Sequence, residues 1–390
     1  MRSFDISCLL VDVFSQTIYP ARINIRDGRI HTVEPLNESA TLRPGYILPG
    51  FIDSHVHIES SMLVPAQFAR IAVTHGTVGT VSDPHEIANV CGLPGIEFMI
   101  DNGKTVPFKF TFGAPSCVPA TSYETAGATL DSKAVADLLG RKEIGYLSEM
   151  MNFPGVLQHD PEVMAKLNAA KKNNKPVDGH APGLRGKSAK SYIDSGISTD
   201  HECFTEAEGK EKLEYGMKII IREGSAARNF EALIALLHDY PDEIMFGSDD
   251  KHPDSLVQGH IGQLCARAVR AGIPLYNILK AACINPVLHY KLDIGLLRIG
   301  DPADFIIVED LKGFKNIQTW INGILVAENG KSHISVTAAP TQTVNNFHCS
   351  EIRQGQLSVF RNEVIGDDGL LPVIGAQDGQ LITKKIFVEP

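Results

Sequence analysis

The sequence predicts an α/β fold: a closed (β/α)8 TIM barrel with a small β-sandwich domain built from segments before and after the barrel. Between residues 50 and 285, eight short β-branched runs alternate with longer helix-type segments. Eight successive units favour closure into a barrel over a doubly wound sheet. The flanking chain contains short strand-type runs, and 390 residues suffice for one large and one small domain.

Residues 1–48 and 286–335 are predicted to form the small domain. Apolar or alternating runs in the first piece are separated by turn residues, and "RDGR" (26–29) is typical of a hairpin. The second piece contains "DFIIVED" (304–310) and "NIQTWINGILVAEN" (316–329). We expect the strands of the two pieces to pack side by side, so the barrel is an insertion between them.

Residues 49–285 are predicted to form the barrel. Its eight strand runs, in chain order, are "GFIDSHVH", "TVGTVSD", "FKFTFGA", "IGYLSEM", "KPVDGH", "GISTDH", "MKIIIRE" and "EIMFGSDD". Helix-type segments between them include 65–75, 133–140, 160–174, 207–215 and 229–238.

We interpret residues 336–390 as the start of a C-terminal region that is truncated here. "TAAPTQTVNNFHC" (337–349) is typical of a loop, whereas "QLSVFRNEVIG" (356–366) and "QLITKKIFVEP" (380–390) are predicted to be strands. The last strand has no visible partner, which would make it prone to aggregation.

Composition argues against nucleic acid and membrane partners. The net charge of -10 and the pI of about 5.8 disfavour a nucleic-acid backbone. No uncharged window is long enough for a membrane helix, and the N-terminus lacks the features of a signal peptide. Seven scattered cysteines without a C-x-x-C pair indicate reduced thiols and a cytoplasmic protein.

The stretch "LPGFIDSHVHIESSM" (48–62) contains the first chemical signal. His55 and His57 alternate along one strand, so both side chains face the same way. Active residues of such barrels lie at the carboxyl ends of strands. Four more runs end in groups that can bind metal, namely Glu149, His180, His201 and Asp249.

Any one of these residues alone could be an ordinary polar side chain at a strand end. Together, four imidazoles and two carboxylates predict a site for two divalent ions, and mixed nitrogen and oxygen ligands suit Mn, Fe or Zn. Two ions roughly 3.5–4 Å apart can share a water and lower its pKa towards neutrality.

Seven segments resemble the adenine deaminases of the amidohydrolase superfamily: "PGFIDSHVHIESSM", "DPHEIANV", "APSCVPAT", "SEMMNFPGV", "DGHAPGL", "REGSAARN" and "FGSDDKHP". The resemblance implies conversion of adenine and water to hypoxanthine and ammonia in purine salvage, by a homodimer containing manganese or iron rather than zinc.

The resemblance also implies roles for individual residues. His55, His57 and Asp249 would hold one ion, His180 and His201 the other, and Glu149 would bridge them. A shared hydroxide would attack C6 of the purine, and Asp249 would move its proton.

A ring nitrogen must also gain a proton, and the candidates for this step are Glu59, His85 and Glu86. Each has a structural alternative: Glu59 could be a charge at a helix N-terminus, and His85 and Glu86 could cap the helix that follows Pro84. Glu86 is also a candidate for binding the substrate, together with Arg222, Glu223, Ser225 and Asp250. Arg222 could instead pair with an acidic residue, and Asp250 could orient a metal ligand.

Two other functions remain open on the sequence. The first is hydrolysis of another cyclic amide, but barrels of that kind often end strand 4 with a carboxylated lysine, where this chain has Glu149. The second is metal binding without turnover, because the C-terminal part is missing. "APGLRGKS" (181–188) nearly fits a phosphate-binding loop, but Ala181 replaces its first glycine, so we interpret it as a chance match.

Overall fold

The barrel consists of eight parallel strands, and it is seen here in a computed structural model that describes residues 3–37, 39–121, 123–335, 344–366 and 369–390. One sheet contains, in order, β5 (Phe51–Val56), β6 (Thr77–Ser82), β7 (Lys109–Ala114), β8 (Ile144–Met150) and β9 (Val177–Gly179). A second contains β10 (Thr199–Asp200), β11 (Lys218–Arg222) and β12 (Ile244–Gly247). The eight predicted runs therefore all contain a strand.

Backbone contacts close the two sheets into a ring. The amide groups of Ser248 and Asp249 donate to the carbonyl oxygen of His55, at 3.1 and 2.8 Å, which joins the end of β12 to β5. At the other junction, the amide of Ser198 donates to the carbonyl oxygen of Val177 at 2.9 Å. All six residues of β5 are buried, as expected for a strand covered on both faces.

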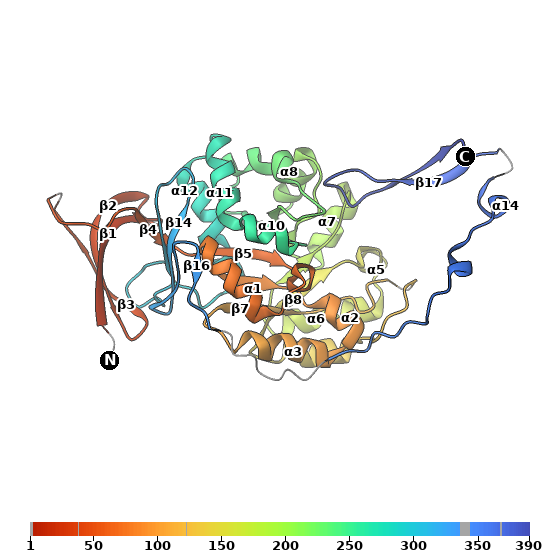
Figure 1. The fold of residues 1–390 in the computed structure, drawn as a ribbon, viewed down its shortest axis with the longest axis horizontal. Coiled ribbons are helices and arrows are strands. Elements are labelled where there is room, and N and C mark those ends of the chain that lie inside the picture. Colours follow the sequence, from red (N-terminus) through yellow and green to blue (C-terminus); the bar gives the residue numbers. More distant parts are fainter. Residues whose placement is uncertain (1–2, 38, 122, 336–343, 367–368) are drawn as a thin grey trace.

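Helices surround the barrel, as Figure 1 shows. They are α1 (Pro65–Ala72), α2 (His85–Cys91), α3 (Leu93–Gly103), α4 (Ser132–Leu139), α5 (Phe153–Leu157), α6 (Pro161–Lys172), α7 (Gly186–Asp194), α8 (Glu206–Glu214), α9 (Phe230–Leu233), α10 (Pro253–Gln258), α11 (Ile261–Arg270), α12 (Leu275–Leu279) and α13 (Asn285–Tyr290). Short 3-10 turns are η1 (Ile58–Ser61), η2 (Val73–His75) and η3 (Ile234–His238), and η4 (Lys280–Ile284) is a π-helical turn.

Local sequence explains where these helices start and which face they bury. Asp131, Asp160 and Thr205 each accept a hydrogen bond from an amide three residues later and so cap α4, α6 and α8. In α11, residues 261, 264, 265 and 268 are buried, which is the spacing of one helix face. Among the described helices, none is long and apolar enough to cross a membrane.

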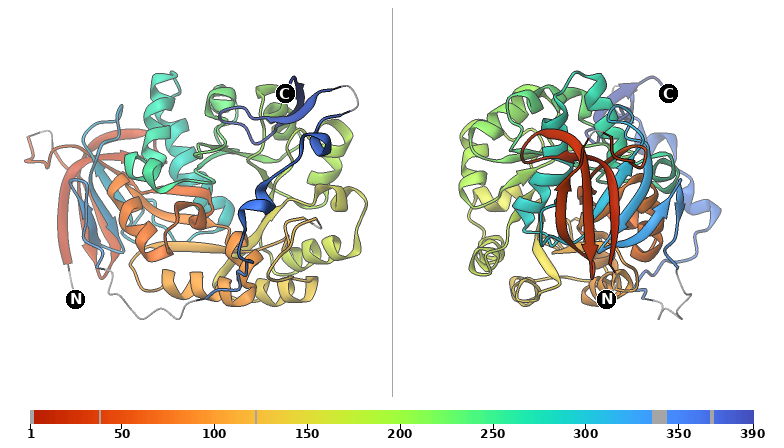
Figure 2. Two further views of the ribbon diagram at one scale, coloured as in Figure 1. Left: turned by 45° about the vertical axis from the view of Figure 1, so that its right-hand side comes forward. Right: turned by 90° about the vertical axis from the view of Figure 1, so that its left-hand side faces the viewer.

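The strands before and after the barrel form a single eight-stranded sheet. Its order is β16 (Lys331–Ser332), β15 (Ile324–Glu328), β14 (Asn316–Ile321), β13 (Phe305–Val308), β4 (Tyr46–Pro49), β1 (Ser3–Asp12), β2 (Thr17–Arg26) and β3 (Arg29–Pro35). Strand β4 lies between β1 and β13, so the two pieces of sequence are joined in the middle of the sheet, and Figure 2 shows the red and blue strands side by side.

The predicted hairpin joins β2 to β3. Asp27 and Gly28 have φ angles of +49° and +81°, which is the pattern of a type I′ turn. A Cβ atom on Gly28 would lie 2.7 Å from the carbonyl oxygen of Asn322, so glycine is required there by contact as well as by conformation.

The C-terminal region contains η5 (Gln354–Leu357), α14 (Arg361–Val364), β17 (Leu371–Gly375) and β18 (Lys384–Val388). The predicted strand at 356–366 is wrong: this segment contains the end of η5 and the helix α14, and Glu363 accepts from the amide of Phe360 at 3.1 Å. The predicted strand near the end is present as β18, and the expectation that it lacks a partner is wrong, because it pairs with β17. The predicted loop 337–349 lies partly outside the described residues, and 344–349 has no regular structure.

The C-terminal ribbon touches the barrel at the loop after β11. Asp378 accepts two contacts of 2.8 Å from Nη2 of Arg228, and the carbonyl oxygen of Gly379 accepts from the amide of Arg228 at 3.1 Å. Figure 1 shows this ribbon far from the small domain.

Candidate active site

His55 and His57, from the end of β5, have neighbouring rings with centroids 4.8 Å apart. The ring of His55 stacks on that of His201, which follows β10, at 4.0 Å. Oδ1 of Asp249, after β12, lies 3.7 Å from Nε2 of His55 and 3.3 Å from Nε2 of His57. The structure thus brings these groups together at the carboxyl ends of the strands.

Glu149 lies between the two sets of imidazoles. Its Oε2 atom is 2.8 Å from Nδ1 of His180 and 3.0 Å from Nε2 of His201, and its Oε1 atom is 3.6 Å from Nε2 of His57. Burial raises the pKa of Glu149, but His180 and His201 hold that pKa well below its usual range, so the carboxylate is ionised. Ser116 donates to the Glu149 carbonyl oxygen at 2.5 Å and holds the end of β8.

The donor set fits divalent metal ions. Both ring nitrogens of His55 and Nδ1 of His201 are buried without a hydrogen-bond partner among the described residues. Such unpaired nitrogens are costly unless a ligand satisfies them. Burial, together with His201 and His57, keeps the pKa of His55 well below 6.5, so its ring is neutral and able to bind a metal. Several groups of side chains have donor atoms within 4.8 Å of one another, among them His55/His57/Asp249, His55/Glu149/His201, His180/His201/Glu202 and His57/Asp83/His85/Glu149.

The groups expected to protonate the ring lie beside this cluster. Nδ1 of His85 is 3.1 Å from Oδ2 of Asp83, and Nε2 of His85 is 3.4 Å from Oε1 of Glu86. Burial lowers the pKa of His85, but Asp83 and Glu86 outweigh it and raise that pKa to about 10. Glu59 accepts from the amide of Ile87 at 3.2 Å, and burial and Glu86 raise its pKa to about 8.

Arg222, expected to contact the substrate or pair with an acid, is paired. It is 2% exposed, and its Nη1 and Nη2 atoms donate to the two oxygens of Glu202 at 2.5 and 2.8 Å. Nη1 also donates to Oδ2 of Asp249. The structure therefore supports the ion-pair interpretation of Arg222.

Two other residues expected to contact the substrate, Glu223 and Ser225, interact with other side chains instead. Glu223 pairs with Arg267 of α11 at 2.8 Å, and Oγ of Ser225 lies 2.6 Å from Oγ of Ser255. Asp250 accepts from Ser60 at 2.5 Å, which links the loops that follow β12 and β5. Asp250 and Glu86 remain close to the site, since each has an oxygen within 4.8 Å of a ring nitrogen of His57.

Sequence reasoning missed residues that support the metal-binding groups. Glu202 is 1% exposed, and its position directly after His201 could have indicated it. Lys212 of α8 lies in a polar run typical of a solvated helix, yet its ammonium group is buried and donates to Asp200, to Glu208 at 2.9 Å and to the Ala181 carbonyl oxygen at 2.8 Å. Nothing in the local sequence distinguishes it.

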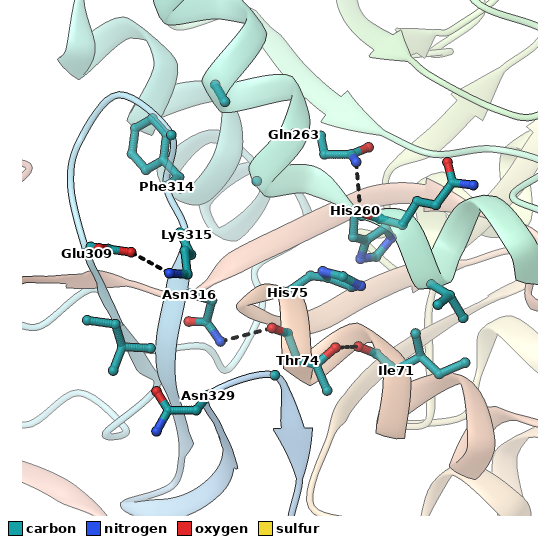
Figure 3. Close-up of a pocket in the computed structure, with 18 of the residues that line it drawn as sticks. Ile71, Thr74, His75, His260, Gln263, Glu309, Phe314, Lys315, Asn316 and Asn329 are labelled. Atoms are coloured by element: carbon teal, nitrogen blue, oxygen red, sulfur yellow. Dashed lines mark hydrogen bonds and ion pairs between the residues drawn. The ribbon is translucent and has the colours of Figure 1, made fainter.

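A groove of about 1790 Å³ lies apart from the clustered imidazoles and carboxylates, between α1, α11 and the small domain. Figure 3 shows His75, His260 and Gln263 on one side and Lys315 and Asn316 on the other. None of the six candidate ligands lines it, so this groove is separate from the candidate active site.

Comparison with known proteins decides the family. The profile of the Amidohydrolase family matches residues 46–326, which is most of the chain. The chain belongs to the amidohydrolase family. Among curated relatives, an adenine deaminase of Salinibacter ruber is 53% identical over 386 residues, covering 99% of this chain and 69% of the relative. An adenine deaminase of Sulfurovum sp. is 55% identical over 380 residues, covering 97% of this chain and 69% of the relative.

Solved amidohydrolase-like structures share the fold at low identity. A beta-aspartyl dipeptidase from Fervidobacterium islandicum AW-1 has a TM-score of 0.62 at 16% identity, covering 87% of this chain and 100% of that one. An adenosine deaminase from Xanthomonas campestris with bound zinc has a TM-score of 0.62 at 13% identity, covering 84% of this chain and 93% of that one. These neighbours support the barrel fold that the sequence predicted.

Proposed function

We propose that the chain catalyses the hydrolytic deamination of adenine to hypoxanthine and ammonia. The observation that carries the proposal is the convergence of ionised carboxylates and unpaired imidazoles, from the ends of five strands, on one mouth of the barrel. Relatives about half identical in sequence are adenine deaminases, which supports adenine as the substrate.

Two divalent ions are the proposed cofactors. His55, His57 and Asp249 would hold one, His180 and His201 the other, with Glu149 between them. Mn²⁺ or Fe²⁺ is proposed over Zn²⁺ because of the resemblance to adenine deaminases, since the imidazole and carboxylate donors themselves suit all three ions. When bound, such a pair supplies a hydroxide at neutral pH by lowering the pKa of water.

Asp249 is the proposed proton carrier. Burial raises its pKa, but His57 and Arg222 keep that pKa well below its usual range, so the carboxylate is ready to accept a proton. It takes the proton from the attacking water and passes it to the exocyclic nitrogen, which leaves as ammonia.

We assign protonation of the purine ring to His85, with Glu59 as the alternative donor. Asp83 fixes the Nδ1 side of the His85 ring, which directs Nε2 towards Glu86. Glu86 and Asp250 are the proposed substrate contacts, since both lie beside His57.

The proposal extends to cellular context. The reaction belongs to purine salvage in the cytoplasm, carried out by a homodimer. All seven cysteines are free, which suits a reducing compartment. Light scattering on the purified protein tests the dimer.

The test is turnover of adenine by purified chain loaded with Mn²⁺ or Fe²⁺, with ammonia and hypoxanthine measured together and bound metal counted by elemental analysis. We expect both products in equal amounts. Asp249→Asn removes the proton acceptor and should abolish them, whereas Asp194→Asn, on an exposed face of α7, should not.

Two outcomes would contradict the proposal. Two ions per chain without ammonia release would indicate metal binding without turnover. Turnover of a cyclic amide such as dihydroorotate, without turnover of adenine, would indicate the other hydrolase class.

A further inference from the structure

Arg222 and Glu202 form a buried clamp on Asp249. Arg222 ends β11, Glu202 follows β10 and Asp249 follows β12, so the three residues bring together the ends of three adjacent strands. Their exposed fractions are 2%, 1% and 3%. The amide of Arg222 also donates to Oδ1 of Asn229 at 2.8 Å, which fixes the strand end that carries the guanidinium group.

The two oxygens of Asp249 have different surroundings. Oδ2 is bound by Nη1 of Arg222, while Oδ1 faces the metal cluster, 3.3 Å from Nε2 of His57 and 3.7 Å from Nε2 of His55. The backbone is fixed as well: Asp249 has a φ of +54°, and its amide donates to the His55 carbonyl oxygen at 2.8 Å. A carboxylate without the Arg222 contact could rotate and exchange its two oxygens.

Glu202 stabilises the buried guanidinium group of Arg222. Isolated in the interior, Arg222 would be costly to desolvate, and a bidentate carboxylate partner offsets part of this cost. Glu202 also orients the planar group, because two parallel contacts leave it little freedom to turn. The geometry of Oδ2 is thus set by two residues that are not among the six proposed ligands, although Oε1 of Glu202 also lies 3.5 Å from Nδ1 of His180 and from Nε2 of His201.

We propose that Arg222, clamped by Glu202, is a positioning residue that holds Oδ2 of Asp249 and so keeps the carboxylate in one orientation, with Oδ1 facing the ring nitrogens of His55 and His57. This inference rests on the proposed deamination. It assigns Arg222 no contact with adenine, so its loss should slow the chemical step without weakening substrate binding.

The variants are Arg222→Met, Arg222→Lys and Glu202→Gln, assayed at saturating metal. Because misplacement of a reacting group by about 1 Å costs on the order of 100-fold in rate, we expect Arg222→Met to lower kcat about 100-fold. Arg222→Lys keeps one contact and Glu202→Gln loosens the clamp, so each should lower kcat about tenfold. KM for adenine should stay within about threefold of the original value in all three.

Two further measurements separate positioning from a merely structural role. Bound metal should remain at the level of the unchanged protein, and the solvent deuterium isotope effect on kcat should increase, because proton transfer becomes slower. The matched control is Arg141→Met, which removes the ion pair between Arg141, in the turn after α4, and Glu97 of α3, and should change none of these values.

Opposite results would overturn the inference. A KM increase above tenfold with kcat retained would make Arg222 a substrate contact. Metal loss in proportion to kcat would make it part of the metal site. If Arg222→Met fails to fold, Arg222→Lys and Glu202→Gln decide by the same criteria. If the unchanged protein releases no ammonia, the proposed function fails first, whereas normal turnover with unchanged variants refutes only the clamp.

Discussion

Asp53 and His260 are 207 residues apart in the sequence, yet Oδ2 of Asp53 lies 2.7 Å from Nε2 of His260 in the buried interior. The same carboxylate accepts from the amide of Ser248 at 2.9 Å and from its hydroxyl at 2.5 Å. Asp53 therefore links the strand that carries His55 to Ser248, the residue before Asp249. We call this link the brace, because it connects the two chain segments that carry His55 and Asp249.

Asp53→Asn tests this brace. The amide replaces one acceptor oxygen with a donor, so we expect a loss of about 2 kcal/mol in unfolding free energy. Metal affinity should fall about tenfold, which is the lower end of the effect of losing a group that orients metal ligands. Urea unfolding and metal titration against a chelator measure the two effects.

Asp304→Asn is the matched control for Asp53→Asn. Asp304 is equally buried and accepts from the amides of Gly295 and Asn322 and from Nζ of Lys109, but it lies just before β13 and contacts neither Ser248 nor His260 through these groups. The Asp304→Asn variant should lose about as much unfolding free energy as Asp53→Asn and keep its metal affinity. Equal metal affinity in both variants would refute the brace.

Lys212→Met should destabilise the protein strongly. Lys212 is the buried cation for Asp200 and Glu208, and removing one partner of a buried ion pair costs about 3–5 kcal/mol because the remaining charge is unpaired. Urea unfolding of the metal-free protein measures this loss. Adding Asp200→Asn should restore part of it, and no recovery in the double variant would show that the carboxylate is not the cause.

Metal removal should lower the melting temperature. An ion that binds only the folded chain stabilises it by about 4 kcal/mol at 1,000 times its dissociation constant, which corresponds to roughly 10 °C for a domain of this size. Scanning calorimetry with and without chelator measures the difference. In His55→Asn the difference in melting temperature should shrink, because the imidazole ligand is lost. An unchanged difference would show that the ions bind elsewhere.

Stability should decrease in mild acid partly because of His289. Burial, with a contribution from Lys218, lowers its pKa to about 4 from an ordinary value of 6.5. Between these values the unfolded chain binds a proton that the folded chain does not, so unfolding free energy falls as pH drops from 6.5 to 4, by about 1.4 kcal/mol per pH unit at most.

Denaturant unfolding at several pH values tests the contribution of His289. His289→Phe should flatten the pH dependence in that window, whereas His31→Gln, at an exposed position on β3, should leave it unchanged. An identical slope in His289→Phe and the unchanged protein would contradict the assignment.

The fold and the six clustered residues were predictable because they follow local rules. Period-two alternation placed His55 and His57 on one face, and barrel geometry places the carboxyl ends of strands together. The same rules do not reveal partners that meet only in three dimensions. The contact between Arg222 and Glu202 depends on the register of β11 against β10. The contact between Asp53 and His260 depends on the position of the start of α11.

The segment at 356–366 shows a different limit. Its apolar residues suggested a strand, but a strand needs a neighbour to accept its hydrogen bonds, and the described chain pairs only β17 with β18 in this region. Local capping by Glu363 then favours a helical turn.

The place of β4 in the middle of the eight-stranded sheet has a consequence for biosynthesis. Strands β1 to β4 leave the ribosome first, but the edge of β4 finds its neighbour β13 only after the entire barrel has been translated. Until then the nascent chain carries a strand edge with unpaired backbone groups. Chaperones recognise such surfaces, and two nascent chains can pair wrongly through them. Slowing translation within the barrel, or depleting holdase chaperones, should therefore reduce the yield of native protein. The reduction should be larger than for a barrel whose flanking strands do not have to pair across it.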